Sequence, residues 1–347
     1  MFETVIRSKL CAAAMGGLFA SAMALSGALP AKAEVNEVRF AQQFGLLYLP
    51  MHVVVDKKYV QACAKDAGMA SPKVKMYKFS GGAAVNQALL SNNVDFAAGG
   101  IGPLLKMWDK TKGRLNVRAM TSLSAMPLKL NTNDKRIKKL EDYVGISDHK
   151  IATPSVKVSI QAVVLQMAAA KKWGAKDAYK LDPLTVSMKH PSAMAALLAG
   201  GQSVKSHFAT LPTSYAELKS GKVHNVLTSY DVLGGEHSVV AMYNTEKFKT
   251  SNPKTYKCVW QSYRKAIKWI NDNKKDAAGL YKRFTKSKLK LEDIEGMVTN
   301  LKEMHYNLEP QRTMQFAKFM HSIKAIKSMP SSWKDYYWEN NYDQNGS

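Results

Sequence analysis

The sequence predicts an α/β protein with mostly parallel sheets, and three observations lead to this prediction. Short apolar strands alternate with helical segments in the first third of the chain, an order typical of a parallel sheet with helices packed on its faces. A second series of the same kind begins near Lys150. The 347 residues, 46% of them hydrophobic, are also enough for two domains of ordinary size, each with its own core.

Two kinds of periodicity define the first series. Residues 73–79 (KVKMYKF) alternate with the period of two that a strand requires. By contrast, Val85, Ala88 and Leu89 share one face of a predicted helix. The expected elements are strand 37–43, helix 49–60, strand 73–79, helix 81–93, strand 94–100 and strand 116–123.

The second series is followed by helices alone. Its expected elements are strand 150–154, helix 159–173, strand 184–190, helix 192–201 and strands 205–210, 222–229 and 238–245. Further helices are expected at 253–273, 276–284, 291–301 and 311–327. Because no strand is expected after residue 245, the C-terminal part is expected to pack back onto an earlier domain.

The first 33 residues have the features of a secretory signal peptide. Arg7 and Lys9 precede an apolar stretch from Leu10 to Leu29, and Ala31-Lys32-Ala33 has the small residues of a signal-peptidase site. A membrane anchor is the alternative, and it is disfavoured because glycine and serine dilute the apolar stretch. We therefore expect cleavage near this motif and export of a mature chain that starts at Glu34.

The chain is strongly basic, with a formal net charge of +23. Residues 1–33 contain three basic residues and one acidic residue, so the mature chain keeps a net charge of about +21. The lysines are scattered, which predicts either a solvated surface or a field that attracts anionic ligands or an acidic partner. Nucleic acid is not an expected partner, because no zinc-ligand spacing, RNA-binding motif or basic-region helix is present.

Two glycine pairs lie at the ends of the stretch 78–100 (KFSGGAAVNQALLSNNVDFAAGG). It contains neither GxxxxGK[ST] nor GxGxxG, which disfavours a phosphate loop and a dinucleotide site. Ser80 is expected to cap the helix, and Gly81 leaves room for a ligand at its free N–H groups. Gly100 ends a strand at the carboxyl edge of the sheet, where open α/β sheets bind ligands. The alternative is that both pairs form tight turns needed only for packing.

A second candidate site lies just before the helix at 159–173. Ser155, Lys157 and Ser159 cluster there with Thr153, so hydroxyls, an ammonium group and N–H groups are placed to converge on an anion. An ordinary capped helix with one surface lysine explains the same residues equally well.

No catalytic or metal-binding motif is present. His190 and His207 are expected on neighbouring strand ends, but neither HExxH nor a close carboxylate accompanies them. A GxSxG elbow is missing, and the mature chain keeps only Cys63 and Cys258, whose pairing stays open. We therefore predict no metal, no cofactor and no enzymatic activity.

Several segments resemble the periplasmic substrate-binding proteins of ABC transporters, in the group for nitrate, sulfonates, taurine and pyrimidine precursors. Residues 38–60 (VRFAQQFGLLYLPMHVVVDKKYV) are similar to the first strand, ligand loop and helix of that family. Residues 79–105 (FSGGAAVNQALLSNNVDFAAGGIGPLL) are similar to its glycine-capped helix, strand and small-residue turn. Residues 137–155 (IKKLEDYVGISDHKIATPS) and 192–218 (SAMAALLAGGQSVKSHFATLPTSYAEL) resemble segments of its second lobe.

The resemblance implies an α/β fold of periplasmic-binding-protein type II, with two α/β lobes joined by two crossing strands and a ligand cleft between them. It places the first part of lobe 1 at 34–127, lobe 2 at 128–238, and the return to lobe 1 with the C-terminal helices at 239–347. The chain departs from the family at Lys205, where an acidic residue is common. It also has Thr210-Leu211 in place of a frequent aromatic-acidic pair, and both departures bear on the ligand class.

The resemblance also implies which residues bind the ligand. They are Gln43, Phe44, Gly45, Tyr48, Ser80, Gly81, Gly100, Ile101, Ser124, Met126, Ser155, Val156, His190, Thr210, Ser229 and Asp231.

The resulting hypothesis is a monomeric periplasmic solute-binding component of an ABC importer. It would capture a small organic anion, such as a sulfonate or a taurine-like, nitrate-like or carboxylate solute, and deliver it to the permease and its ATPase. The alternative is a binding protein for a neutral or cationic metabolite, such as a pyrimidine or thiamine precursor. An enzyme or a sensor on the same scaffold is a third hypothesis, and the lack of a cysteine cluster weakens it.

Overall fold

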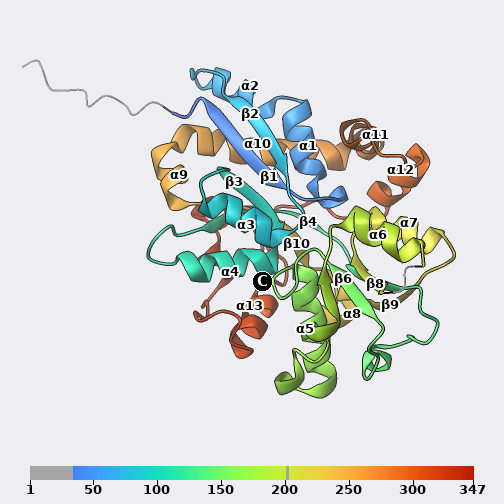
Figure 1. The fold of residues 1–347 in the computed structure, drawn as a ribbon. Helices are drawn as coiled ribbons and strands as arrows, with labels where there is room; N and C mark the ends of the chain where they lie inside the picture. The colour runs from blue at the N-terminus through green and yellow to red at the C-terminus, as the bar shows by residue number, and fades with distance from the viewer. Residues whose placement is uncertain (1–33, 201–202) are drawn as a thin grey trace, which may run out of the picture. The chain divides into compact units, whose positions relative to one another are not determined.

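The structure is a computed structural model that describes residues 34–200 and 203–347, which form two five-stranded sheets (Figure 1). The predicted signal peptide lies outside the described residues. The first sheet contains, in spatial order, β2 (Lys73–Lys78), β1 (Glu37–Gln42), β3 (Phe96–Gly100), β10 (Ser238–Asn244) and β4 (Arg118–Ala125). The second contains β7 (Thr185–Ser187), β6 (Lys150–Thr153), β8 (Val204–Ala209), β5 (Lys129–Thr132) and β9 (His224–Thr228).

Both sheets are mixed rather than mostly parallel as predicted, because β10 and β5 each pair antiparallel with both of their neighbours. The chain passes between the sheets twice. In the first sheet β1 is parallel to β2 and β3, and β10 lies antiparallel between β3 and β4. In the second sheet β6 is parallel to β7 and β8, whereas β5 is antiparallel to β8 and β9. The chain leaves the first sheet after β4 and returns to it in β10. This topology confirms the predicted fold class of two α/β lobes joined by two crossings.

We call the parts built on the first and second sheets lobe 1 and lobe 2. The chain changes sheet between Ala125 and Lys129, and it changes back between Thr228 and Ser238. These positions support the predicted lobe boundaries after residues 127 and 238, which we keep as a proposal.

Helices pack on both sheets. Before the first crossing the chain forms α1 (Leu49–Asp56), α2 (Tyr59–Asp66), α3 (Gly82–Leu90) and α4 (Ile101–Thr111). Between the crossings it forms α5 (Ile160–Trp173), α6 (His190–Leu198), α7 (Thr213–Lys219) and α8 (Ser229–Leu233). After β10 it forms α9 (Glu246–Ser251), α10 (Pro253–Asp272), α11 (Lys274–Thr285), α12 (Leu291–Thr299) and α13 (Thr313–Ser322).

The long C-terminal helices pack on lobe 1. Helix α10 lies against α1 and α2, and α11 lies against α1 and α12 (Figure 1). Short 3-10 helices complete the chain at Leu46–Tyr48 (η1), Leu140–Tyr143 (η2), Ala175–Asp177 (η3), Asp182–Leu184 (η4), Trp333–Tyr336 (η5) and Glu339–Asn341 (η6). Among the described residues, no helix is both long enough and apolar enough to span a membrane.

The core of lobe 1 is rich in aromatic side chains and is linked by a disulfide. Phe40 on β1 contacts Phe96 on β3 and Tyr263 on α10, with ring centroids 5.6 and 6.0 Å apart. Cys63 on α2 and Cys258 on α10 form a disulfide with a Cα–Cα distance of 5.5 Å, so the pairing that the sequence leaves open is made.

The structure corrects two predicted elements and adds several that the sequence does not predict. The single helix expected at 49–60 is two helices, because Lys58 adopts a left-handed conformation with a φ of 51°. The strand expected at 184–190 ends at Ser187, and His190 is instead the first residue of α6. Pro191 explains this start, since proline suits the first turn of a helix. The α-helices and strands without a counterpart among the predictions are α4, α7, α8, α9 and β5. Gly102 and Pro103 obscure the helical pattern of α4. The other four are only four to seven residues long, too short for a clear periodicity.

Candidate functional site

A small cavity lies between the two lobes, beside the carboxyl ends of parallel strands. It encloses about 20 Å³, which is close to the space that one water molecule needs. Its walls include residues that follow β1, β3, β6, β7 and β8, the position where open α/β sheets bind ligands. The lining residues are Gln43, Phe44, Leu47, Tyr48, Gly82, Gly100, Pro103, Ser159, Ile160, Gln161, His190, Thr210, Val239 and Val240.

Four helices begin at this cavity. Gly82, Ile160 and His190 are the first residues of α3, α5 and α6, and Gly100 is the N-cap of α4. The peptide dipoles of a helix produce a partial positive charge at this end, where the first N–H groups lack an intrahelical acceptor. The backbone N–H groups of Ile160 and Gln161 have no acceptor among the described residues. The helix starts therefore give the cavity a positive potential.

The hydroxyl of Thr210 is buried at the cavity without a hydrogen-bond partner. The side chain is 2% exposed, and its Oγ1 finds no partner within the described part of the chain. A buried hydroxyl without a partner costs about 1–3 kcal/mol, and this one lies at the wall of the cavity. Tyr48 lines the cavity from lobe 1, and burial raises the pKa of its phenol. That group therefore stays protonated and able to donate.

His190 connects the cavity with a buried polar chain in lobe 2. Its Nδ1 lies 2.8 Å from Nε2 of His207, and His207 Nδ1 lies 2.5 Å from Oε1 of Glu217. His207 and Glu217 are both fully buried. The sequence predicts no carboxylate beside these histidines, and this prediction is wrong because α7 packs Glu217 against β8. His207 also lies inside β8 rather than at a strand end.

The lobes touch each other on two sides of the cavity. The backbone N–H of Leu46 in lobe 1 donates to the carbonyl oxygen of Leu211 in lobe 2 at 3.0 Å. The backbone N–H of Ala83 at the start of α3 faces the hydroxyl oxygen of Ser155 at 3.4 Å. The lobes are therefore closed around the cavity.

Two glycines allow the lobes to approach this closely. A Cβ on Gly81 would lie 2.2 Å from the carbonyl oxygen of Pro154 in lobe 2. A Cβ on Gly100 would lie 2.9 Å from the Cβ of Ile160. Any larger residue at these two positions conflicts with the closed arrangement.

The structure brings together part of the predicted site. The predicted residues that line the cavity are Gln43, Phe44, Tyr48, Gly100, His190 and Thr210. Those that lie at contacts between the lobes are Gly45, Gly81 and Ser155. Those outside both groups are Ser80, Ile101, Ser124, Met126, Val156, Ser229 and Asp231.

Three of the predicted polar residues outside the cavity have structural partners. Ser124 donates its hydroxyl to the carbonyl oxygen of Leu47 at 3.1 Å. Ser229 accepts from the N–H of Leu128 at 2.9 Å, and the exposed Asp231 caps α8 through Thr228. These groups stabilise the crossings and a helix start.

The expected cap of α3 is wrong. Gly81 rather than Ser80 is the N-cap, and no side chain caps this helix. Ser80 is exposed to solvent instead. In the second predicted cluster, Ser159 caps α5 by accepting from the N–H of Ala162, whereas Lys157 is exposed.

Gln161 is the polar lining residue that sequence reasoning missed. It lies in the first turn of α5, two residues after the Ser159 cap. A polar residue in the first turn of a helix that starts at a cleft could have indicated a ligand contact. The apolar residues around Gln161 made this signal easy to miss.

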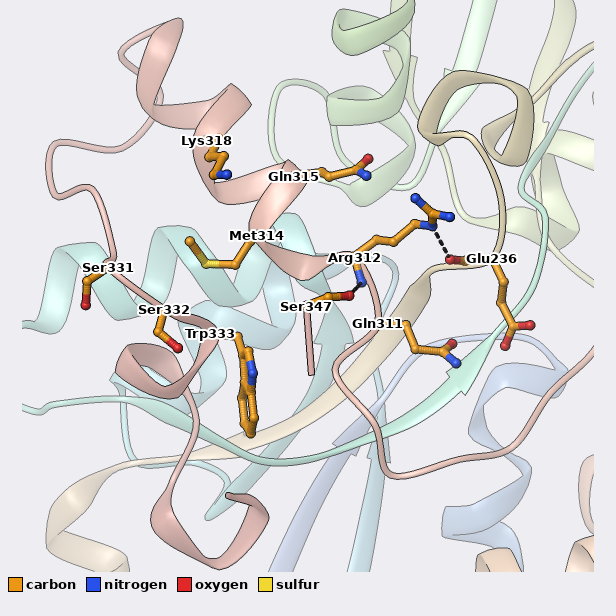
Figure 2. A pocket seen from close by; sticks show the side chains of 10 residues that line it. All are labelled: Glu236, Gln311, Arg312, Met314, Gln315, Lys318, Ser331, Ser332, Trp333 and Ser347. Atoms are coloured by element: carbon orange, nitrogen blue, oxygen red, sulfur yellow. Dashed lines mark hydrogen bonds between the residues drawn. The ribbon is translucent and has the colours of Figure 1, made fainter. Parts of the chain in front are cut away.

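A second and larger hollow lies away from the cleft, near the C-terminus (Figure 2). Its volume is about 830 Å³, and its lining includes Arg312, Lys318 and Trp333. Figure 2 shows Arg312 directed at Glu236, whose carbonyl oxygen accepts from the guanidinium Nε at 3.0 Å. Because its arginine is already engaged, this open hollow is the weaker candidate for a ligand site.

The two-lobed topology and the enclosed cleft define the fold of the periplasmic substrate-binding proteins, and solved structures of such proteins match it. The chain is similar to the alkanesulfonate-binding protein of Xanthomonas axonopodis pv. citri bound to MOPS, with 13% identity over 88% of this chain and 99% of that chain and a TM-score of 0.68. It is also similar to the periplasmic nitrate-binding protein of Synechocystis PCC 6803, with 14% identity over 89% of this chain and 88% of that chain and a TM-score of 0.68.

A third similar structure is the periplasmic aliphatic sulphonate binding protein of Escherichia coli, with 15% identity over 88% of this chain and 92% of that chain and a TM-score of 0.61. At these identities the likeness shows a common fold. No protein-family model matches the sequence, and no curated protein matches it either.

Proposed function

We propose that this chain is the solute-binding component of an ABC importer and that its cleft captures a small organic anion. The observation that carries the proposal is the convergence of four helix N-termini on one cavity between two closed lobes. Helix N-termini attract anions through their free N–H groups and their dipoles. Sulfonates, taurine-like and nitrate-like solutes and carboxylates all present the oxygen atoms that such groups bind.

The side chains of the cavity support an anion over a cation. None of the described residues that line it is an Asp or a Glu, and a buried cation needs such a partner. The unpaired hydroxyl of Thr210 and the protonated phenol of Tyr48 add two potential donors. Phe44 and Leu47 supply an apolar wall for the rest of the solute.

The volume of the cavity implies a conformational step. About 20 Å³ is too little for a whole organic anion, so entry requires the lobes to separate. Hinge closure around a ligand is the usual behaviour of two-lobed binding proteins. The closed state would then retain a compact head group at the helix N-termini.

Export and partners follow from the same proposal. The predicted signal peptide at residues 1–33 would direct the mature chain to the periplasm, and its charge of about +21 suits capture of anions. We propose that it acts as a monomer without catalytic activity and presents both lobes to a permease with its ATPase. The comparisons support this because the similar structures named above are binding proteins.

The proposal is tested by a ligand panel on residues 34–347. Thermal unfolding is followed with nitrate, methanesulfonate, taurine, acetate and a pyrimidine, because a ligand that binds the native state alone raises the Tm. We expect at least one anion to raise the Tm in a concentration-dependent way. A rise with the pyrimidine alone would replace the anion by a neutral metabolite.

A further inference from the structure

A hydrogen-bonded chain of side chains runs from the cavity into the core of lobe 2. Gln161 Nε2 lies 3.3 Å from His190 Nε2, and His190 Nδ1 lies 2.8 Å from His207 Nε2. His207 Nδ1 lies 2.5 Å from Glu217 Oε1, and Glu217 Oε2 accepts from Asn131 Nδ2 at 2.8 Å. His190 is 5% exposed, and His207 and Glu217 are fully buried. Gln161 and His190 line the cavity, whereas His207, Glu217 and Asn131 do not.

The positions of the protons on this chain determine whether His190 Nε2 presents a hydrogen-bond donor or an acceptor to the cavity. One proton lies between the two imidazoles and one between His207 and Glu217, since each contact is a hydrogen bond. When both histidines are neutral, His190 carries its proton on Nδ1, and its Nε2 is an acceptor toward the cavity. In that form Nε2 accepts from the amide of Gln161 and repels an oxyanion.

One additional proton reverses this polarity. It adds to the lone pair of His190 Nε2, while the proton on His190 Nδ1 moves to Nε2 of His207. His190 is then neutral with a donor at Nε2, and His207 is an imidazolium beside the carboxylate of Glu217. We place the positive charge on His207 because Glu217 Oε1 lies 2.5 Å from its Nδ1, whereas the partners of His190 are Gln161 and His207. Burial, together with His207, also holds the pKa of His190 well below its usual value.

We propose that His190, His207 and Glu217 couple anion capture to the uptake of one proton, which turns His190 Nε2 from an acceptor into a donor. This inference rests on the proposed function, and it specifies the ligand group as an oxyanion. It makes His190 a residue that contacts the ligand, and it makes His207 and Glu217 positioning residues.

The other titratable groups near the chain do not compete for this proton. Tyr48 faces the cavity from lobe 1, and burial raises the pKa of its phenol. Lys157, before α5, and Lys189, before α6, are both exposed to solvent. On β5 the neighbour is the uncharged amide of Asn131.

The experiment measures anion affinity between pH 5.5 and 8.5 on residues 34–347. The probes are nitrate, methanesulfonate and acetate, titrated by calorimetry in amine buffers of different ionisation enthalpy. We expect uptake of about one proton per anion at the alkaline end, with affinity falling about tenfold per pH unit there. An affinity independent of pH overturns this proposal and leaves the proposed function intact.

Two variants separate a positioning role from a purely structural one. Glu217→Gln keeps the shape but removes the partner of the imidazolium, so anion affinity at pH 7 should fall by about tenfold or more, and the proton uptake should be lost. His149→Gln is the control, because His149 is a buried lobe 2 histidine that bonds Ser206 and Asp134 outside the cavity. It should keep both the affinity and the proton uptake.

A spectroscopic reading covers the case in which Glu217→Gln fails to fold. In wild-type protein labelled with ¹⁵N at histidine, His190 should carry its proton on Nδ1 when free at pH 8.5 and on Nε2 when an anion is bound. The same tautomer in both states overturns the proposal. A lack of binding by all three anions would instead count against the proposed function itself, and the inference would fall with it.

Discussion

The buried hydroxyl of Thr210 has no hydrogen-bond partner among the described residues. Thr210→Val removes that hydroxyl at nearly constant volume. The ligand-free protein should then gain up to about 1 kcal/mol in its free energy of unfolding, because an unpaired buried group disappears. Anion affinity should fall about tenfold, because a donor to the ligand is lost. Urea unfolding and calorimetric titration measure the two effects.

Thr153 offers a matched control. It is also fully buried, and its Oγ1 is likewise without a partner in the described residues, but it does not line the cavity. Thr153→Val should therefore gain stability without a change in affinity. Unchanged affinity in Thr210→Val, whatever its stability, would show that this hydroxyl does not serve the ligand.

Two buried histidines make stability depend on pH. Burial, helped by Lys78, lowers the pKa of His52 to about 3, and burial, helped by Arg312, lowers that of His237 to about 4. In the unfolded chain both pKa values are near the ordinary value of about 6.5, so unfolding takes up protons below that pH. The free energy of unfolding should be at its full value above about pH 6.5 and fall toward pH 4 by about 1.4 kcal/mol per pH unit for each histidine.

Urea unfolding at pH 7, 6, 5 and 4.5 measures this slope. His237→Gln should lower the slope by the share of this one histidine, about 1.4 kcal/mol per pH unit. Equal stability of the wild-type protein at pH 7 and pH 4.5 would contradict the burial of neutral histidines.

The sequence predicts those site residues that follow directly from local order. Gly100 ends a strand, so strand order alone places it at the cleft. Phe44 and Tyr48 were predicted through the family resemblance, and both line the cavity. The contact between Glu217 and His207 could not be predicted from local sequence order, because it depends on how α7 packs in the folded protein. Asp231 was predicted to bind the ligand, but in the structure its side chain takes part in the capping box at the start of α8.

At the scale of elements, the starts of α3 and α4 set how far the lobes close. Gly81→Ala and Gly100→Ala each add a methyl group that would meet the opposite lobe within 3 Å. Each should lower anion affinity at least tenfold by opposing closure, while the stability of the open protein changes little. Calorimetric titration gives the affinity, and small-angle scattering should show that saturating anion no longer compacts the protein.

Gly296 in α12 is the control for these variants. A Cβ there meets no heavy atom within 4 Å, and alanine favours a helix by about 0.5–1 kcal/mol over glycine. Gly296→Ala should be more stable than the wild type and should bind equally well. Normal affinity in Gly81→Ala and Gly100→Ala would assign both glycines to packing alone.

The order of the elements was predictable because their periodicities are strong, whereas their limits depend on single residues. Lys58 divides a segment that has a helical pattern throughout. Its left-handed backbone conformation depends on tertiary packing and cannot be predicted from the local sequence. Pro191 converts the end of a predicted strand into the start of α6. That change moves His190 from a strand end to a helix N-terminus, where it faces the cavity.

At the scale of the whole molecule, the disulfide stabilises lobe 1 without controlling the cleft. Cys63 and Cys258 are 195 residues apart, and closing a loop of that length contributes up to about 5 kcal/mol. Replacing both by serine should therefore lower the free energy of unfolding by about 3–5 kcal/mol and leave anion affinity within about twofold. A tenfold loss of affinity in the folded variant would show that α2 and α10 also set the geometry of the cleft.

The central claim is that the cleft between the lobes captures an anion at four converging helix N-termini. Calorimetric titration of residues 34–347 with nitrate and with methanesulfonate at pH 6 tests it most directly. We predict saturable binding of at least one of them, with one site per chain and a clear loss of affinity in Thr210→Val. Saturation by a pyrimidine and by neither anion would contradict the claim.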